Sequence, residues 1–158
     1  MPILAYNKKA KFDYQLLETL EAGLVLTGQE VKSIRQGQAS LQGAYVTLNQ
    51  KNEASLLNAN VPAYKMAGPL PDYDPTHSRK LLLNKKEINY LKGKLQQIGL
   101  TLIPLSLYTK HKKIKLELAL AKGKKKFDKR RTIKEREEKR KIQRVLKQKF
   151  QSSARANY

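Results

Sequence analysis

Positive charge is distributed unevenly along this chain, and that distribution limits how much of it can fold into a compact domain. Residues 122–158 contain 16 Lys or Arg and 4 Asp or Glu, a net charge of +12, whereas residues 1–121 carry only +8. The C-terminal segment has seven large apolar side chains, which are Phe127, Ile133, Ile142, Val145, Leu146, Phe150 and Tyr158. Burying so few cannot offset the ordering cost of roughly 1–2 kcal/mol per residue. We therefore expect a folded body over 1–121 and a basic tail over 122–158 that is disordered until it binds a polyanion.

The composition of the body excludes several classes of protein. Its 121 residues are enough to bury a hydrophobic core. The chain has no cysteine, which excludes disulfides and thiolate metal sites, and its two histidines are too few for a histidine-based metal site. The N-terminus lacks the charged-then-apolar order of a secretion signal, and no apolar run approaches the roughly 20 residues that span a bilayer. We therefore expect a cytoplasmic protein without metal, cofactor or membrane partner.

The first half of the body contains a strand signal followed by a helix signal, after a short basic leader over residues 1–11. Residues 14–26 are apolar-rich with strand character and are interrupted at Gly23, which predicts two short strands or one strand bent at a glycine bulge. Thr27 and the glutamate three residues later have the spacing of a capping box, which predicts the start of a helix. Gly37 is placed to end that helix.

A hairpin, a loop and a second helix follow. Residues 44–48 and 54–57 flank a polar loop and predict a β-hairpin. Residues 62–78 contain four of the six prolines and predict a loop, which leads into a short apolar segment over 79–83. Asn84, with a glutamate three residues on, predicts a helix start. Apolar residues at helical spacing continue to a glycine stop at Gly99, and these residues are Ile88, Leu91, Leu95 and Ile98.

The strongest strand signal is a hairpin over residues 100–108 and 113–121. One face of its first strand is expected to carry Thr101, Ile103, Leu105 and Leu107, and the apolar face of its second strand Ile114, Leu116, Leu118 and Leu120. Several antiparallel strands with inserted helices predict a mainly β fold. By architectural analogy, we expect an oligonucleotide-binding (OB-type) closed antiparallel β-barrel with accessory helices.

We find no set of residues suited to catalysis. Asp72 and Asp74 lie in the proline-rich loop, where turn chemistry explains them, and His77 and His111 lie in loops without partners for a metal site. Gly123-Lys124-Lys125 lacks the upstream glycine and the hydroxyl of a phosphate-binding loop. We therefore expect a protein that is not an enzyme.

The remaining signal is clustered basic charge, which favours a nucleic-acid partner over dispersed charge for solubility. The clusters are Lys8-Lys9-Ala10-Lys11, Arg79-Lys80, Lys112-Lys113-Ile114-Lys115 and Lys122–Lys126. One interpretation is a set of solvated faces, and the other is that several clusters converge on one RNA groove and contact phosphates. Tyr6 and Phe127, in the leader and the tail, are expected to be free to stack on bases, whereas Tyr14 is expected in the core.

Long motifs along the chain are similar to those of a known family. They are Asn7-Lys8-Lys9-Ala10, Asp13-Tyr14, Glu21-Ala22-Gly23-Leu24 and Gly28-x-Glu30-Val31-Lys32-Ser33-Ile34-Arg35 near the start, Asp74-Pro75-x-x-x-Arg79-Lys80-Leu81-Leu82-Leu83-Asn84 in the middle, and Ala121-Lys122-Gly123-Lys124-Lys125 with Asp128-Lys129-Arg130 in the tail. On these motifs the chain resembles the bacterial ssrA-binding protein (small protein B) family. The resemblance spans about residues 5–147, and Phe150 to Tyr158 match nothing in it.

The resemblance implies an OB-type barrel that grips the tRNA-like domain of transfer-messenger RNA, one copy per RNA, in the rescue of stalled ribosomes. It also implies a tail that becomes helical in the decoding centre and the empty mRNA channel. By motif position, the RNA grip would include Asn7, Glu21, Leu82, Asn84 and Lys115. The ribosome-facing residues would be Gly123, Lys124, Phe127, Asp128, Lys129 and Arg130. The basic clusters add Lys8, Arg79, Lys80 and Lys113 as RNA contacts.

Four alternatives differ from this interpretation. A structural ribosomal protein, or another OB-fold translation factor, would share the basic charge, but a structural protein would stay on the ribosomal subunits through a high-salt wash. An RNA-modifying enzyme would need a cofactor pocket, for which the sequence offers no support. A membrane-surface arm is disfavoured because a helix over residues 133–150 would carry charge all round its axis.

Overall fold

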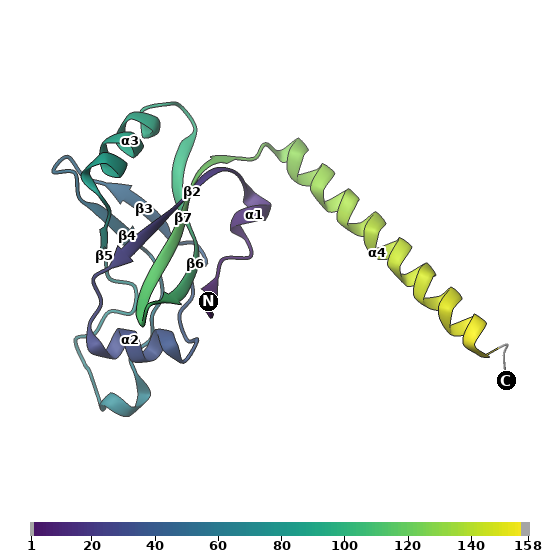
Figure 1. Ribbon diagram of the computed structural model, residues 1–158, viewed down its shortest axis with the longest axis horizontal. Coiled ribbons are helices and arrows are strands. Elements are labelled where there is room, and N and C mark those ends of the chain that lie inside the picture. The colour runs from purple at the N-terminus through teal and green to yellow at the C-terminus, as the bar shows by residue number, and fades with distance from the viewer. Residues whose placement is uncertain (1, 156–158) are drawn as a thin grey trace. The chain divides into compact units, whose positions relative to one another are not determined.

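The computed structural model describes residues 2–155, with side chains to residue 148 (Figure 1). Tyr158 and the side chain of Phe150 lie outside the described residues. The chain divides into two compact units, Met1–Gly123 and Lys124–Tyr158. The last body strand thus continues two residues beyond the predicted boundary at Ala121, because Lys122 and Gly123 still pair with the sheet. No helix in the described part of the chain is long and apolar enough to cross a membrane.

Seven strands of the described residues form one antiparallel sheet, which confirms the mainly β prediction. The strands are β1 (Ile3–Tyr6), β2 (Tyr14–Leu24), β3 (Tyr45–Leu48), β4 (Ala54–Leu57), β5 (Arg79–Leu82), β6 (Leu100–Lys110) and β7 (Lys113–Gly123). Their order is β1-β6-β3-β4-β5-β2-β7, and β6 pairs in addition with β7. The longest ladders join β7 to β2 and to β6, the two other 11-residue strands.

Four short helical segments connect these strands: α1 (Ala10–Asp13), α2 (Gly28–Arg35), the 3₁₀ turn η1 (Lys65–Ala67) and α3 (Lys85–Leu95). The predicted start of α2 is confirmed, since Thr27 N–H donates to Glu30 Oε2 at 2.8 Å and Thr27 Oγ1 accepts from Glu30 N–H at 3.4 Å. Gly37, with φ of +72°, follows the end of this helix as predicted. Leu91 is fully buried and fixes α3 on the body.

Local predictions fail where tertiary pairing intervenes. Part of the expected basic leader is strand β1, paired with β6, followed by α1. The irregularity in β2 lies between Leu16 and Glu18 rather than at Gly23. The expected inward position of Ile98 is wrong: α3 ends at Leu95, and Ile98 is 99% exposed.

A second irregularity changes which side chains of β6 share a face. The register of β6 against β7 shifts between Pro104 and Ser106, and an inserted residue reverses the in-and-out alternation beyond it. Ile103 and Leu105 consequently pack in a small cluster with Ala10, whereas Leu107 lies in the main core. The prediction that Ile103, Leu105 and Leu107 share one face of β6 is therefore wrong. The predicted face of β7 is confirmed, because its four members all lie in the main core, namely Ile114, Leu116, Leu118 and Leu120.

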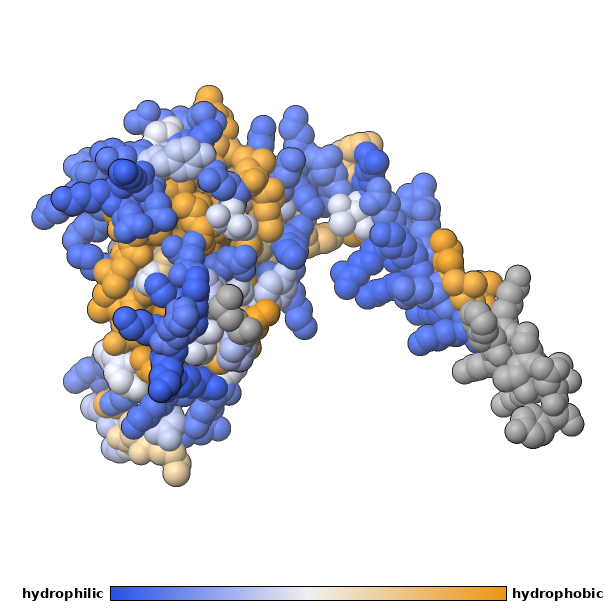
Figure 2. Space-filling model, viewed as in Figure 1, coloured by the Kyte–Doolittle hydropathy of each residue, from blue (hydrophilic) through white to orange (hydrophobic). Residues whose placement is uncertain are grey.

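In the described part of the second unit, residues 126–155 form one helix, α4 (Lys126–Arg155), where the sequence predicted a disordered tail. The segment is rich in helix-forming residues, and Arg131 pairs with Glu135 one turn later at 3.1 Å. None of its residues from 126 to 148 is buried. Figure 2 shows a mainly hydrophilic surface on α4 with a hydrophobic patch towards its C-terminal part, where Ile142, Val145 and Leu146 are about half exposed.

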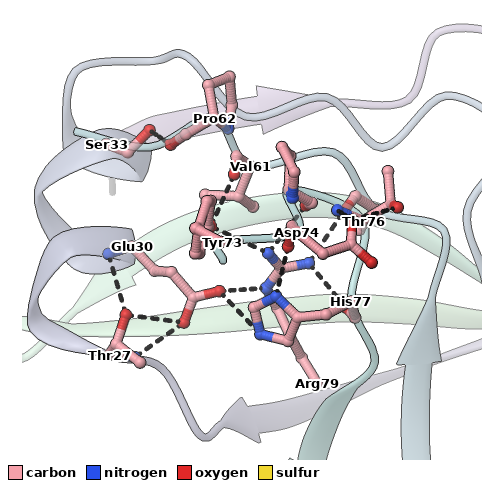
Figure 3. A network of polar contacts seen from close by, with 12 residues as sticks. Thr27, Glu30, Ser33, Val61, Pro62, Tyr73, Asp74, Thr76, His77 and Arg79 are labelled. Atoms are coloured by element: carbon pink, nitrogen blue, oxygen red, sulfur yellow. Dashed lines mark hydrogen bonds and ion pairs between the residues drawn. The ribbon is translucent and has the colours of Figure 1, made fainter. Parts of the chain in front are cut away.

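A buried ion pair ties α2 to the start of β5 (Figure 3). Arg79 Nε donates to Glu30 Oε1 at 2.6 Å, and both side chains are 1% exposed. The other guanidinium nitrogens donate to the carbonyl oxygens of Ala59, His77 and Pro75. Burial alone would raise the pKa of Glu30, but the hydrogen bonds from Thr27 N–H and from Arg79 outweigh it and lower that pKa.

The same network holds the long loop over residues 62–78 against the body. Tyr73 donates its hydroxyl hydrogen to the Val61 carbonyl at 2.7 Å, and Ser33 Oγ donates to the Pro62 carbonyl at 2.7 Å. His77 Nε2 lies 3.3 Å from Glu30 Oε1. The loop therefore enters β5 in one conformation, which sets the direction of the residues that follow on that strand.

Replacing Arg79 by Met should destabilise the protein by about 3–5 kcal/mol, because it leaves the Glu30 carboxylate buried without its partner. Urea unfolding at pH 7 measures this change. The matched control is Lys80→Met, which breaks the exposed Lys80–Glu53 pair of 2.8 Å and should cost at most about 1 kcal/mol.

The pH dependence has a defined sign. Because the folded-state pKa of Glu30 is depressed, the ionised Glu30 contributes to the free energy of unfolding above the ordinary glutamate pKa. This contribution is lost as the pH falls through the folded-state pKa.

If Arg79→Met and Lys80→Met destabilised the protein equally, the buried Glu30–Arg79 pair would not be what holds the fold.

Candidate nucleic-acid interface

Two open grooves lie on either side of the exposed end of β5, and Leu82 lines both. The first, here called the α2 groove, measures about 410 Å³ and has an apolar floor and a basic rim formed by Arg35, Lys112, Lys113 and Lys115. The second, the α3 groove, measures about 520 Å³ and is lined in part by Lys51, Lys80 and Lys85. Basic rims around apolar floors suit a polyanion whose bases are exposed.

Leu82 is the ridge between the grooves, with 54% of its surface exposed. It pairs with Gly23 of β2, and a Cβ placed on Gly23 would lie 3.2 Å from Leu82 Cβ. The missing side chain at Gly23 therefore allows Leu82 to lie close against β2. An exposed apolar side chain among lysines offers van der Waals contact with a base or ribose rather than with phosphate.

The carboxylate of Glu21 lies next to Lys115 of the α2 groove and is held by three residues. Its Oε2 accepts hydrogen bonds from the Tyr108 hydroxyl and from Lys110 Nζ, the latter at 2.9 Å, and its Oε1 lies 3.6 Å from Lys115 Nζ. The hydrogen bond from Tyr108, followed by that from Lys110, lowers the pKa of Glu21 to about 2. Burial, and then the bond to Glu21, raises the pKa of Tyr108 to about 12. The carboxylate is thus ionised and the phenol neutral at physiological pH.

Lys115 connects this carboxylate to the α2 groove, because the same side chain lines the groove and faces Glu21. On its other side Glu21 borders a third hollow of about 390 Å³, lined also by Ile3, Leu20 and Tyr108. The structure therefore brings together four of the predicted RNA-contacting residues, which are Glu21, Leu82, Lys113 and Lys115.

Two further predicted residues lie along the α3 groove or next to its lining. Lys80 lines that groove and pairs with Glu53. Asn84 is exposed at the start of α3, between two groove-lining residues, and its backbone N–H donates to Glu87 Oε2 at 2.8 Å. Both are accessible to a ligand that lies across Leu82.

Asn7 and Arg79 have structural positions instead of exposed ones. Asn7 is 6% exposed; its Nδ2 donates to the carbonyls of Leu41 and Pro104, and its Oδ1 accepts from Ala10 N–H. Arg79 is 2% exposed, with its guanidinium bonded within the chain. Their burial corrects the expectation that they offer polar groups directly to RNA. Motif position and positive charge do not distinguish a buried polar group from an exposed one.

The basic clusters do not all line the same groove: Lys80 lines the α3 groove, Lys112, Lys113 and Lys115 line the α2 groove, and Leu82 is shared by the two. Lys8 is exposed, and its neighbours Asn7 and Lys9 line a separate groove of about 450 Å³ with Tyr14. Tyr14 pairs with Gly123 at one end of the β2–β7 ladder, and Lys115 pairs with Gly23 at the other. At about 3.3 Å per residue the two ends are roughly 25–30 Å apart.

The predicted ribosome-facing residues lie at the end of β7 and in the first turns of α4. Gly123 ends β7, Lys124 follows, and Phe127, Asp128, Lys129 and Arg130 lie in α4. Phe127 is 76% exposed, as expected for a residue that can stack. Tyr6 is 41% exposed, with Lys11 Nζ 5.7 Å from the centre of its ring. Tyr14, predicted in the core, is partly buried and packs against the small cluster from outside.

Sequence reasoning missed the roles of Tyr108 and Lys110. It placed a four-residue turn over 109–112, whereas the turn is His111-Lys112, both with positive φ, and Lys110 pairs with Lys113. Two adjacent left-handed residues are typical of a two-residue hairpin turn. The corrected register extends β6 by two residues and brings Lys110 to Glu21.

Comparisons with known proteins agree with the motif resemblance. The family model described as "SmpB protein" matches residues 4–148. The SsrA-binding protein of Trichodesmium erythraeum is 49% identical over 146 residues, covering 92% of this chain and 93% of that protein. The SsrA-binding protein of Streptomyces coelicolor is 48% identical over 144 residues, covering 91% and 89%. A solved structure described as "tmRNA-SmpB: a journey to the center of the bacterial ribosome" contains a chain of 42% identity, with a TM-score of 0.64 over 77% of this chain and 84% of that one.

Replacing Lys113 by Gln should weaken RNA binding, because it removes one charge from the rim of the α2 groove. One lost phosphate contact should also reduce the slope of log K against log salt by about 0.7–0.9. Filter binding over a range of salt concentrations measures both quantities. The control is Lys65→Gln in η1, which removes the same charge from a residue that lines neither groove beside Leu82. An equal loss in both variants would mean that the effect is one of net charge and not of the groove.

Proposed function

Because this chain belongs to the SmpB protein family, we propose that it is an RNA-binding translation factor that binds the tRNA-like domain of transfer-messenger RNA and delivers it to stalled ribosomes. The observation that carries the proposal is the family match over residues 4–148, which includes both the body and most of the tail. The exposed surface around Leu82 supplies the chemistry that such binding needs. The proposed activity is binding without catalysis, one copy per RNA, in the cytoplasm where ribosomes work.

The body would provide a rigid platform for this RNA. The pairings run from β6 through β3, β4, β5, β2 and β7 and return to β6, a circuit that supports an OB-type closed barrel. Closure leaves few free strand edges and fixes the positions of side chains on different strands. Glu21 on β2, Leu82 on β5 and Lys115 on β7 would then present one surface of constant shape.

The chemistry of that surface supports recognition of folded RNA. Lys113 and Lys115 are suited to phosphate contacts, which position the ligand without reading its sequence. Leu82 is suited to apolar contact, and an ionised Glu21 can accept a hydrogen bond from a base or a ribose hydroxyl. A surface that combines these three types of contact distinguishes a structured RNA from any polyanion of equal charge.

The tail would bind the ribosome, and we propose that the order of α4 depends on that binding. Its charge of +12 over residues 122–158 opposes a compact state in the free protein, and none of its residues from 126 to 148 is buried. Ribosomal RNA in the decoding centre and the mRNA channel would neutralise this charge. Phe127 would stack on a base there, while Lys129 and Arg130 would contact phosphates.

The alternatives are less well supported. A structural ribosomal protein or an unrelated OB-fold factor would not account for a family match that extends through the tail to residue 148. An RNA-modifying enzyme would need a cofactor site. The polar groups around Leu82 and Glu21 are explained without one.

Ending the chain after Gly123 should leave binding of the tRNA-like domain within about threefold of the full-length value, because all of the grooves beside Leu82 lie in the first unit. Tagging of nascent peptides on stalled ribosomes should be abolished. Gel-shift binding and a reconstituted tagging assay measure the two activities. If the truncated chain lost RNA binding as completely as tagging, the division between body and tail would be refuted.

Replacing Lys129 and Arg130 together by Ala should reduce tagging strongly while changing affinity for free transfer-messenger RNA by less than about twofold. Phe127→Ala removes a stacking contact worth roughly 1–3 kcal/mol and should have a smaller effect on tagging. A matched control removes two charges elsewhere in α4, with Lys139→Ala and Arg140→Ala, and should reduce tagging less than the Lys129/Arg130 pair. Tagging that survives the Lys129/Arg130 replacement, or that falls only in proportion to RNA binding, would contradict the assigned role.

A further inference from the structure

We propose that Tyr108 and Lys110 are positioning residues for RNA recognition, which hold Glu21 Oε2 so that Oε1 is presented to a hydrogen-bond donor of the RNA. The proposal rests on the proposed function and deepens it. Neither the family motifs nor the clusters of basic residues pointed to these two side chains as part of the RNA-binding surface.

The geometry separates the two oxygens of Glu21. Oε2 accepts from the Tyr108 hydroxyl and from Lys110 Nζ, so its lone pairs are occupied. In the described part of the chain Oε1 accepts no hydrogen bond, and Lys115 Nζ lies 3.6 Å away. Oε2 is therefore fixed by two hydrogen bonds, whereas Oε1, which lies beside Lys115, can still accept one from a ligand.

The contacts to Glu21 reach across a whole strand. Glu21 is on β2 and Tyr108 is on β6, and β7 lies between them, with Lys115 paired to Tyr108 on one side and to Gly23 on the other. Strands two apart are separated by roughly 10 Å. The long side chains of Tyr108 and Lys110 bridge this gap. Such a bridge is independent of the local sequence around Glu21 and is available only in the folded sheet.

The charges around Glu21 explain why its carboxylate needs hydrogen bonds that fix its position. Glu117 of β7 lies directly opposite Glu21, and two carboxylates in register repel each other. Glu117 Oε2 accepts from Ser106 Oγ at 2.8 Å, which turns that oxygen toward β6. Lys110, Lys115 and the Tyr108 hydroxyl are the groups that favour ionised Glu21. Without the phenol, Glu21 would lose one of the two hydrogen bonds that hold Oε2.

The chemistry of Glu21 Oε1 determines which kind of RNA group it can contact. An ionised carboxylate only accepts hydrogen bonds, and phosphate has no hydrogen to donate at neutral pH. Oε1 therefore suits a base amino or imino group or a ribose 2′-hydroxyl. The flanking lysines place the adjacent phosphates while Oε1 contacts the donor.

The test replaces Tyr108 by Phe, which keeps the ring and removes the hydroxyl, and measures binding to the transcribed tRNA-like domain of transfer-messenger RNA. We expect binding about tenfold weaker, because Oε1 would no longer be held in place and would lose its proposed hydrogen bond to the RNA, and a hydrogen bond to a charged group is worth about that much. In a Glu21→Gln background the same replacement should cost less than about twofold. The matched control is Tyr90→Phe, since the Tyr90 hydroxyl donates to Glu18 Oε2 at 2.7 Å on the same strand β2. This control should bind within about twofold of the wild type.

A titration of the free protein separates positioning from a merely structural role. Carboxyl-carbon NMR should place the pKa of Glu21 at about 2 in the wild type and nearer the ordinary value of about 4.3 in Tyr108→Phe, with the Tyr90 variant unchanged at Glu21. Unchanged RNA binding in Tyr108→Phe, or an equal loss in the Glu21→Gln background, would overturn the proposal. Failure of the wild type to bind this RNA would instead refute the proposed function.

Discussion

The long ladder between β2 and β7 is the constraint on which the rest of this structure depends. It runs from Tyr14 opposite Gly123 to Gly23 opposite Lys115, and alternate residues of β7 fill the main core. One end of the ladder presents Lys115 beside Leu82 and the other leads into the basic C-terminal segment. A single pair of strands thus sets the separation between the proposed RNA-binding surface and the start of the tail.

Two glutamates show how the same side chain serves different purposes in this framework. Glu30 is buried, and Arg79 and the Thr27 N–H compensate its charge so that α2, the long loop and β5 hold together. Glu21 is at the surface, and Tyr108 and Lys110 fix one of its oxygens while leaving the other accessible. Both pKa values are depressed. The shift of Glu30 reflects the stability of the fold, whereas we propose that the held carboxylate of Glu21 prepares a surface for a ligand.

The candidate site could be predicted only in part. Lys113 and Lys115 follow from the clustering of charge, whereas Glu21 and Leu82 follow from family motifs alone, because neither is basic. Arg79 and Asn7 look like RNA contacts in the sequence but are buried in the structure. The sequence alone does not show whether a guanidinium or an amide is hydrogen-bonded inside the protein or exposed at its surface. Tyr108 and Lys110 were missed because a turn two residues shorter than predicted changes which side chains reach across β7.

The sequence by itself determined the starts of α2 and α3, the apolar face of β7 and the division between body and tail. The first depends on capping and the second on period-two alternation, which are patterns within a few neighbouring residues. The third depends on net charge, which follows from composition. Only the tertiary structure decided that Leu107 turns into the core, that β1 joins the sheet, and that Leu82 separates two grooves. Each of these depends on a register shift or on a pairing between residues far apart in the chain, and a one-residue shift reverses the face of every side chain beyond it.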